Sequence, residues 1–128
     1  MILKESWIFV TDNTNINWVK TFHLYQGHHR KKSTVGFFIK ASARVVEPPR
    51  LEYKGFKYKY NVKGDICKLM LVRCNRTFVS KSSYVFRLKG NSGYVLKKRQ
   101  EPKSKFLNGP VLRLMGRKKT GSLFPVTL

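Results

Sequence analysis

Apolar and polar residues alternate along much of the chain, and this alternation predicts a mostly β protein. Across residues 35–45 every odd position is apolar, and Lys40, Ser42 and Arg44 occupy even positions between them. This is the period of a strand with one face in a core and the other in solvent. Pro48-Pro49 ends the pattern, because proline lacks the N–H that a β-ladder needs.

A second clear strand is predicted at residues 66–72, where Lys68 alone interrupts an apolar run. A run that is apolar on both faces is typical of a strand at the centre of a sheet. The turn before it is Lys63-Gly64-Asp65. Regularly spaced short strands favour a small barrel, which leaves no exposed sheet edge. The shorter strand candidates are residues 6–10, 18–25, 84–89 and 94–97.

Residues 51–61 depart from the strand pattern because aromatic residues there alternate with Lys54, Lys57 and Lys59. We expect a projecting β-hairpin arm with Gly55 near its tip. Two interpretations stay open. The arm either grips RNA, with stacked aromatic rings and lysines on phosphate, or is an ordinary strand pair with its aromatic side chains in the core.

The end of the chain, residues 97–121, is a basic extension rich in Lys, Arg, Pro and Gly. Residues 111–115 are expected to form one helical turn after Gly109-Pro110, because proline suits the first turn of a helix. With 128 residues, the chain fits one domain spanning residues 1–128.

The net charge indicates the partner. The chain carries 27 Lys and Arg against 6 Asp and Glu, which gives +21 at pH 7. A folded protein with this charge repels itself, so a polyanion, most simply a nucleic acid, is the expected partner. The basic clusters fall between the predicted strands, so contact over several surfaces is expected. The predicted RNA-binding residues are Arg30, Lys31, Lys32, Lys54, Lys57, Lys59, Arg73, Lys97, Lys98, Arg99, Lys105, Arg113, Arg117, Lys118 and Lys119.

Signals for catalysis, metals and membranes are weak. Cys67 and Cys74 are expected to be buried and unpaired, because residues seven apart on one unbroken strand face opposite sides. A zinc site with His28 and His29 is the alternative, although the spacing matches no standard finger. The acidic residues are scattered, and no nucleophile elbow or phosphate-binding glycine motif occurs, so no enzyme, cofactor or metal is expected. No apolar run is long enough to span a membrane.

Met1-Ile2 and four later motifs, taken in order, resemble those of the universal fourteenth protein of the large ribosomal subunit, in its bacterial and organellar form. The resemblance runs essentially from end to end of the chain. The later motifs are residues 10–15, 26–37, 63–73 and 109–113, which read VTDNTN, QGHHRKKSTVGF, KGDICKLMLVR and GPVLR.

This resemblance implies a closed five-stranded β-barrel with a hairpin projection and a short helical C-terminal part. It implies a structural constituent of the large ribosomal subunit, bound to large-subunit rRNA near the subunit interface and touching small-subunit rRNA in intersubunit bridges. The implied protein neighbours are the third and nineteenth large-subunit proteins. Ser104 and Lys105 occupy the place where a ribosome-silencing factor docks on family members.

Departures from the family pattern suggest the setting. Asn15 replaces a glycine, which is tolerable because Asn visits the left-handed region more readily than most residues. Trp7, Trp18, Tyr25 and Phe38 add aromatic bulk. This drift, with a bias towards Lys, Asn, Phe and Tyr, favours a mitochondrial gene and a protein of the mitochondrial ribosome in the matrix. The N-terminus shows no presequence, as expected for a protein made in the organelle. A plastid or a bacterial cytoplasm is the alternative.

A free-standing β-barrel module that engages RNA transiently is the competing function. Such a module would concentrate aromatic side chains on one exposed sheet face. In this chain most strand aromatics fall among apolar positions, and we expect them in the core, which favours the ribosomal interpretation.

Overall fold

The computed structural model describes residues 1–48 and 60–112, and these residues form strands, turns and loops without a helix. Within these ranges there is accordingly no helix that could cross a membrane. The strands in chain order are β1 (Trp7–Val10), β2 (Ile16–His23), β3 (Phe38–Val46), β4 (Ile66–Arg73), β5 (Arg76–Val79), β6 (Val85–Leu88) and β7 (Ser92–Leu96).

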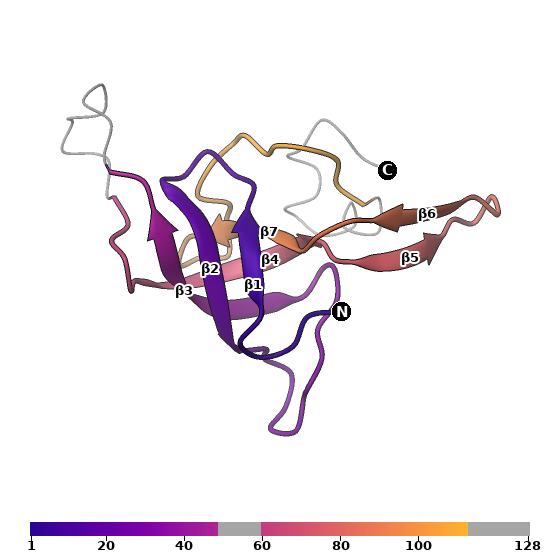
Figure 1. The fold of residues 1–128 in the computed structure, drawn as a ribbon, viewed down its shortest axis with the longest axis horizontal. Helices are drawn as coiled ribbons and strands as arrows, with labels where there is room; N and C mark the ends of the chain where they lie inside the picture. The colour runs from indigo at the N-terminus through magenta and orange to yellow at the C-terminus, as the bar shows by residue number, and fades with distance from the viewer. Residues whose placement is uncertain (49–59, 113–128) are drawn as a thin grey trace.

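Five strands close into a barrel in the order β1-β2-β3-β4-β7, which confirms the predicted architecture (Figure 1). Neighbouring strands are antiparallel except for β1 and β7, whose parallel pairing closes the barrel. Closure pairs both edges of every barrel strand, so the sheet presents no open edge. The remaining strands, β5 and β6, form a separate hairpin that projects from the barrel.

The strand predictions differ from the structure mainly at strand ends. Both ends of β2 lie two residues before the predicted ones. The start of β3 lies at Phe38 rather than at residue 35, because Gly36 has a φ of 85° and turns the chain just before the strand. The first strand of the projecting hairpin, β5, was not predicted at all.

The barrel interior is filled by alternate residues of the five strands. Side chains on β3 that face inward include two alanines, Ala41 and Ala43, and small residues suit the inside of a five-stranded barrel. The inward residues of the other strands are mostly aliphatic and less than 10% exposed. They include Ile8, Val10, Ile16, Val19, Leu69, Leu71 and Val95.

A second apolar cluster lies on the outside of the barrel, over β4 and β7. It contains Met70 and Val72 from β4 with Tyr94 and Leu96 from β7. Val111, from the chain that follows β7, packs on it and is fully buried. This second layer explains why β4 is apolar on both faces and confirms that it is the central strand.

The two cysteines lie in the same core, which corrects the expectation that they face opposite sides. Cys67 and Cys74 both belong to the cluster inside the barrel. The pairing of β4 with β7 shifts register between Leu71 and Arg73, and such an irregularity resets the alternation of faces. Both thiols are free, and burial raises the pKa of Cys67.

The expectation that the strand aromatics lie in the core is wrong for β1 and β2. Trp7, Phe9, Trp18 and Phe22 point outward and are 50%, 41%, 40% and 43% exposed. The reason is that these strands are apolar on both faces, so composition does not say which set faces inward. The barrel interior takes the smaller aliphatic residues at the alternate positions.

Two predicted features fall on residues that the structure does not describe. Residues 49–59 contain nearly all of the predicted hairpin arm, so the arm stays a prediction. Residues 113–128 contain most of the predicted helical turn. The two described residues of that turn, Val111 and Leu112, are not helical, so the described chain gives it no support.

Asn15 does not use the left-handed region that its place in the family motif suggests, because it is not among the residues with positive φ. Its side chain instead ties the start of β2 to two distant segments. The amide nitrogen donates to the carbonyl oxygen of Asn61 at 2.8 Å and to that of Glu47 at 3.3 Å. The amide oxygen accepts from the backbone N–H of Asn61 at 3.2 Å. Asn15 therefore closes the base of the chain between β3 and β4.

Asp12 fastens the turn after β1 to β7. One carboxylate oxygen accepts from the backbone N–H of Thr14 at 3.2 Å, as expected for an Asp that ends a strand. The other accepts from the backbone N–H of Val95 at 2.8 Å. Burial raises the pKa of Asp12 above its ordinary value of 3.8, although these hydrogen bonds and the charge of Lys103 act in the opposite direction.

Replacing Asp12 with Ala is expected to destabilise the barrel by about 1–3 kcal/mol, because the buried N–H of Val95 loses its acceptor. Thermal and urea unfolding measure the effect. Glu101→Ala removes the same charge from an exposed site and is the control, with an expected change within about 0.5 kcal/mol. Equal unfolding midpoints for the two variants would contradict the assigned role.

The same variant also makes a pH prediction. Since the pKa of Asp12 is higher in the folded protein than in the unfolded chain, the folded state holds this proton more tightly. The stability that protonation provides is present below pH 3.8 and is lost as the pH rises through the folded pKa. The stability gap between wild type and Asp12→Ala is therefore expected to narrow as the pH rises. A gap that widens would contradict the raised pKa.

Candidate nucleic-acid interface

The densest predicted cluster lies in the loop between β2 and β3. Lys31 and Lys32 are exposed there. Arg30 is half-buried and shapes the loop: its Nε donates to the carbonyl oxygen of Lys32 at 2.8 Å, and its Nη1 donates to the side chain of Gln26. Its guanidinium lies over the ring of Phe37, 4.5 Å from the centroid. The arginine thus holds the backbone while the two lysines stay free to reach a phosphate.

A depression in the surface lies beside this loop. It is lined by Leu3 and Lys4 from the N-terminal segment and by His28, His29, Arg30 and Lys31 from the loop. The two histidine rings are in edge contact, 4.8 Å between centroids. Among the described residues no three His, Cys, Asp or Glu side chains are grouped for a metal, so the zinc alternative has no support there. The cationic lining fits a phosphate group better.

The second described cluster follows β7. Lys97, Lys98 and Arg99 form an exposed turn, closed by the N–H of Gln100 donating to the carbonyl oxygen of Lys97 at 3.0 Å. Further along, Lys105 is also exposed. In Figure 1 this segment crosses one end of the barrel, while the loop between β2 and β3 lies at the other end. The structure therefore does not bring the predicted RNA-binding residues together on one surface.

Arg73 is placed differently from the other predicted RNA-binding residues. Its Nη1 donates to the carbonyl oxygen of Pro110 at 3.0 Å, and its Nη2 donates to that of Asn108 at 2.9 Å. Gly109 between them has a φ of 91°, and a Cβ there would lie 2.5 Å from Nη1. Burial lowers the pKa of Arg73. Arg73 therefore holds the turn at residues 108–110, and its contact with RNA stays a prediction.

The projecting β5–β6 hairpin is a basic element that the sequence reasoning missed. Phe78 and Phe86 stack across it with centroids 5.8 Å apart, and its tip is closed by the N–H of Ser80 donating to the carbonyl oxygen of Tyr84 at 2.8 Å. The available signal was the pair of short β-branched and aromatic runs on either side of a serine-rich turn. Its exposed basic residues are Arg76, Lys81, Arg87 and Lys89.

Little of the positive charge is neutralised within the fold. In the part of the chain that the structure describes, one ion pair is present, between Lys20 and Glu5 at 3.4 Å. The remaining predicted RNA-binding residues lie outside the described ranges, and their positions stay untested. These are Lys54, Lys57, Lys59, Arg113, Arg117, Lys118 and Lys119.

The predicted docking position for a silencing factor lies on the segment that crosses the barrel after β7. Ser104 is half-buried, and its hydroxyl oxygen accepts from the backbone N–H of Phe106 at 3.2 Å. Lys105 and Phe106 are exposed beside it, and the ring of Phe106 is 70% exposed. The serine thus shapes the backbone, and the two neighbouring side chains are the ones presented to solvent.

A comparison with protein-family models finds one match. The family model described as ribosomal protein L14p/L23e matches residues 1–125, which is nearly the whole chain.

Proposed function

Since the chain belongs to the ribosomal protein L14p/L23e family, we propose that it is anchored on large-subunit rRNA through basic loops at both ends of its barrel. Membership of the family makes it a structural protein of the large ribosomal subunit, with ribosomal RNA and ribosomal proteins as partners. The barrel is the rigid support, and the loops carry the contacts with RNA.

The observation that carries the proposal is the exposed and almost unpaired positive charge. Lys31 and Lys32 at one end, and Lys97 and Lys98 at the other, are exposed on a chain of net charge +21. Phosphates neutralise such groups and release their condensed counterions, which favours binding without any sequence reading. A protein surrounded by rRNA needs contacts on more than one side, and the separation of the clusters fits that arrangement.

The proposal includes the finer assignments of the resemblance. We place the protein near the subunit interface, where it contributes to bridges with small-subunit rRNA and lies beside the third and nineteenth large-subunit proteins. Lys105, exposed next to Ser104, is the described residue that a ribosome-silencing factor would meet. The ribosome is proposed to be mitochondrial, which is supported by the abundance of Lys, Phe and Tyr in the chain.

One observation favours the alternative of a free-standing RNA-binding module. The aromatic residues of β1 and β2 are exposed, and an exposed aromatic sheet face is the feature expected of such a module. The two functions differ in where the protein resides: a ribosomal constituent sediments with the large subunit, whereas a transient module does not.

Sucrose-gradient sedimentation of a native lysate tests the proposed function. The protein is expected to co-sediment with large subunits and joined ribosomes, and to stay with the large subunit when the subunits are separated. The large-subunit rRNA profile in the same gradient is the control for intact particles. Protein found at the top of a gradient whose large-subunit peak is intact would contradict the proposal.

A further inference from the structure

Four aromatic side chains form a continuous patch on the outer face of β1 and β2. Phe9 is paired with Trp18 across the strands, and their rings meet edge to face with centroids 5.3 Å apart. Trp7 is paired with Lys20, so Trp18 and Phe22 are its diagonal neighbours on the same face. We call these four aromatic residues, Trp7, Phe9, Trp18 and Phe22, the aromatic face.

The opposite side of the barrel shows what a covered face looks like in this protein. There Tyr94 and Met70 are 1% exposed, because chain that follows β7 packs over β4 and β7 through Val111. On the aromatic face the four rings remain 40–50% exposed among the residues that the structure describes. A contiguous exposed apolar patch of this kind is a common mark of an interaction site.

Positive charge surrounds the aromatic face. Lys20 lies between Trp18 and Phe22 on β2, and Lys40 and Arg44 are exposed on the neighbouring strand β3. Trp18 pairs with Val45, next to Arg44, where the register of β2 and β3 shifts. Glu5 is the one acid paired with this group, through Lys20 at 3.4 Å. Rings flanked by cations suit a ligand that is both planar and anionic.

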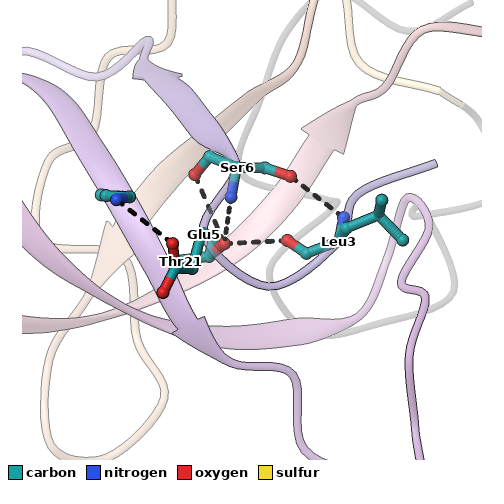
Figure 2. Close-up of polar contacts among 5 residues, drawn as sticks. Leu3, Glu5, Ser6 and Thr21 are labelled. Atoms are coloured by element: carbon teal, nitrogen blue, oxygen red, sulfur yellow. Dashed lines mark hydrogen bonds and ion pairs between the residues drawn. The ribbon is translucent and has the colours of Figure 1, made fainter.

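The backbone beneath the aromatic face is held firmly (Figure 2). The hydroxyl of Thr21, 1% exposed, accepts from the backbone N–H of Ser6 at 3.0 Å and donates to the carbonyl oxygen of Leu3 at 2.9 Å. The backbone N–H of Glu5 donates to the carbonyl oxygen of Thr21 at 2.8 Å. These bonds fix the entry to β1, and therefore Trp7, against β2. A fixed platform loses little conformational entropy when a ligand stacks on it.

We infer that the aromatic face binds unpaired nucleotides of rRNA by stacking their bases on Trp18 and its neighbours, while Lys20, Lys40 and Arg44 meet the phosphates. The inference rests on the proposed rRNA binding and adds a second mode to it. The loops at the barrel ends recognise phosphate alone, whereas the aromatic face requires bases that are not already stacked in a helix.

Intrinsic fluorescence gives a direct test, because Trp7 and Trp18 are the two tryptophans of the chain and both lie on the aromatic face. A single-stranded oligouridylate is added to the full-length protein, and a duplex RNA with the same number of phosphates is added to a second sample. Saturable quenching by the single strand and little change with the duplex are expected. Binding without quenching, or equal quenching by both RNAs, overturns the inference.

Variants separate stacking from general affinity. Trp18→Leu keeps an apolar side chain but removes the ring, and it is expected to weaken single-strand binding about 5- to 150-fold, while duplex binding is unchanged. Trp18→Phe retains a ring and should recover most of the lost affinity. The matched control is Phe106→Ala, an exposed aromatic residue away from the face, which should leave both affinities unchanged. Circular dichroism checks that each variant is folded.

The outcomes distinguish this inference from the function on which it rests. If both RNAs bind with strong salt dependence but Trp18→Leu changes neither affinity, the stacking inference fails and the rRNA anchoring stands. If neither RNA binds at low salt, the proposed function itself fails. If Trp18→Leu releases the protein from large subunits while its RNA affinities are those of wild type, the face docks a protein, and the inference is overturned.

Discussion

Binding of the full-length protein to an rRNA fragment is expected to weaken by about 10³–10⁵-fold as salt rises from roughly 50 to 200 mM. This range corresponds to about 6–10 phosphates neutralised on binding. The physical basis is the charge of +21, of which one ion pair is satisfied within the described residues. Because phosphate contacts carry no sequence information, fragments of different sequence should follow nearly the same curve.

Fluorescence anisotropy of a labelled RNA at several salt concentrations measures this effect. The slope of log affinity against log salt should be about −0.9 for each phosphate on duplex RNA and about −0.7 on single strands, if the values for DNA carry over. Titration with a neutral crowding agent in place of salt is the control for non-electrostatic effects. A nearly flat salt titration would show that the basic side chains do not face the RNA.

The second large effect is expected for Arg30, Lys31 and Lys32 replaced together by Ala. At about 0.5–1 kcal/mol for each exposed contact, rRNA affinity should fall roughly 10- to 150-fold, and incorporation into the large subunit should fall with it. The melting temperature should stay close to that of wild type, because exposed charges contribute little to folding and their mutual repulsion is relieved.

A matched triple variant tests whether position or total charge matters. Lys4, Lys63 and Lys89 are exposed and scattered, so replacing them with Ala removes the same charge without removing a cluster. This variant should incorporate almost normally. Equal loss of large-subunit incorporation in the two triple variants would mean that the loop between β2 and β3 has no special role.

The other end of the protein gives a contrast between assembly and subunit joining. Replacing Arg113, Lys118 and Lys119 by Ala is expected to spare incorporation into the large subunit more, and to lower the fraction of joined ribosomes, because this end of the chain is proposed to lie near the interface. The measurement is the ratio of free large subunits to joined ribosomes in sucrose gradients. Identical profiles for this variant and the variant at residues 30–32 would refute the division of roles.

Arg30 and Arg73 show why the predicted site was only partly readable. Both were assigned to RNA because composition marks every basic residue alike. In the fold, Arg73 donates to the carbonyl oxygens of Asn108 and Pro110, and Arg30 donates to that of Lys32. Which cations are consumed by backbone carbonyls depends on segments up to 37 residues apart along the chain. A local pattern contains no information on such contacts.

The hairpin illustrates a different limit. Residues 51–61 attracted attention because aromatics and lysines alternate there, yet the projection that the structure describes is β5–β6. Its sequence is ordinary for a strand pair, and nothing local states that it leaves the barrel. Projection follows from closure, because β4 pairs with β7 and the chain between them has no place in the sheet.

Alternation by itself determined that the chain is a β protein, where β3 and β4 lie, and that a small barrel resolves the edges of its sheet. Charge by itself determined the kind of partner. The direction of each strand's faces was decided only by the tertiary structure. On β1 and β2 both faces are apolar, so closing the barrel around a narrow interior selected Ile8 and Val19 for the inside and left Phe9 and Trp18 outside. The volume available inside a closed barrel is a property of five strands together, and no single strand encodes it.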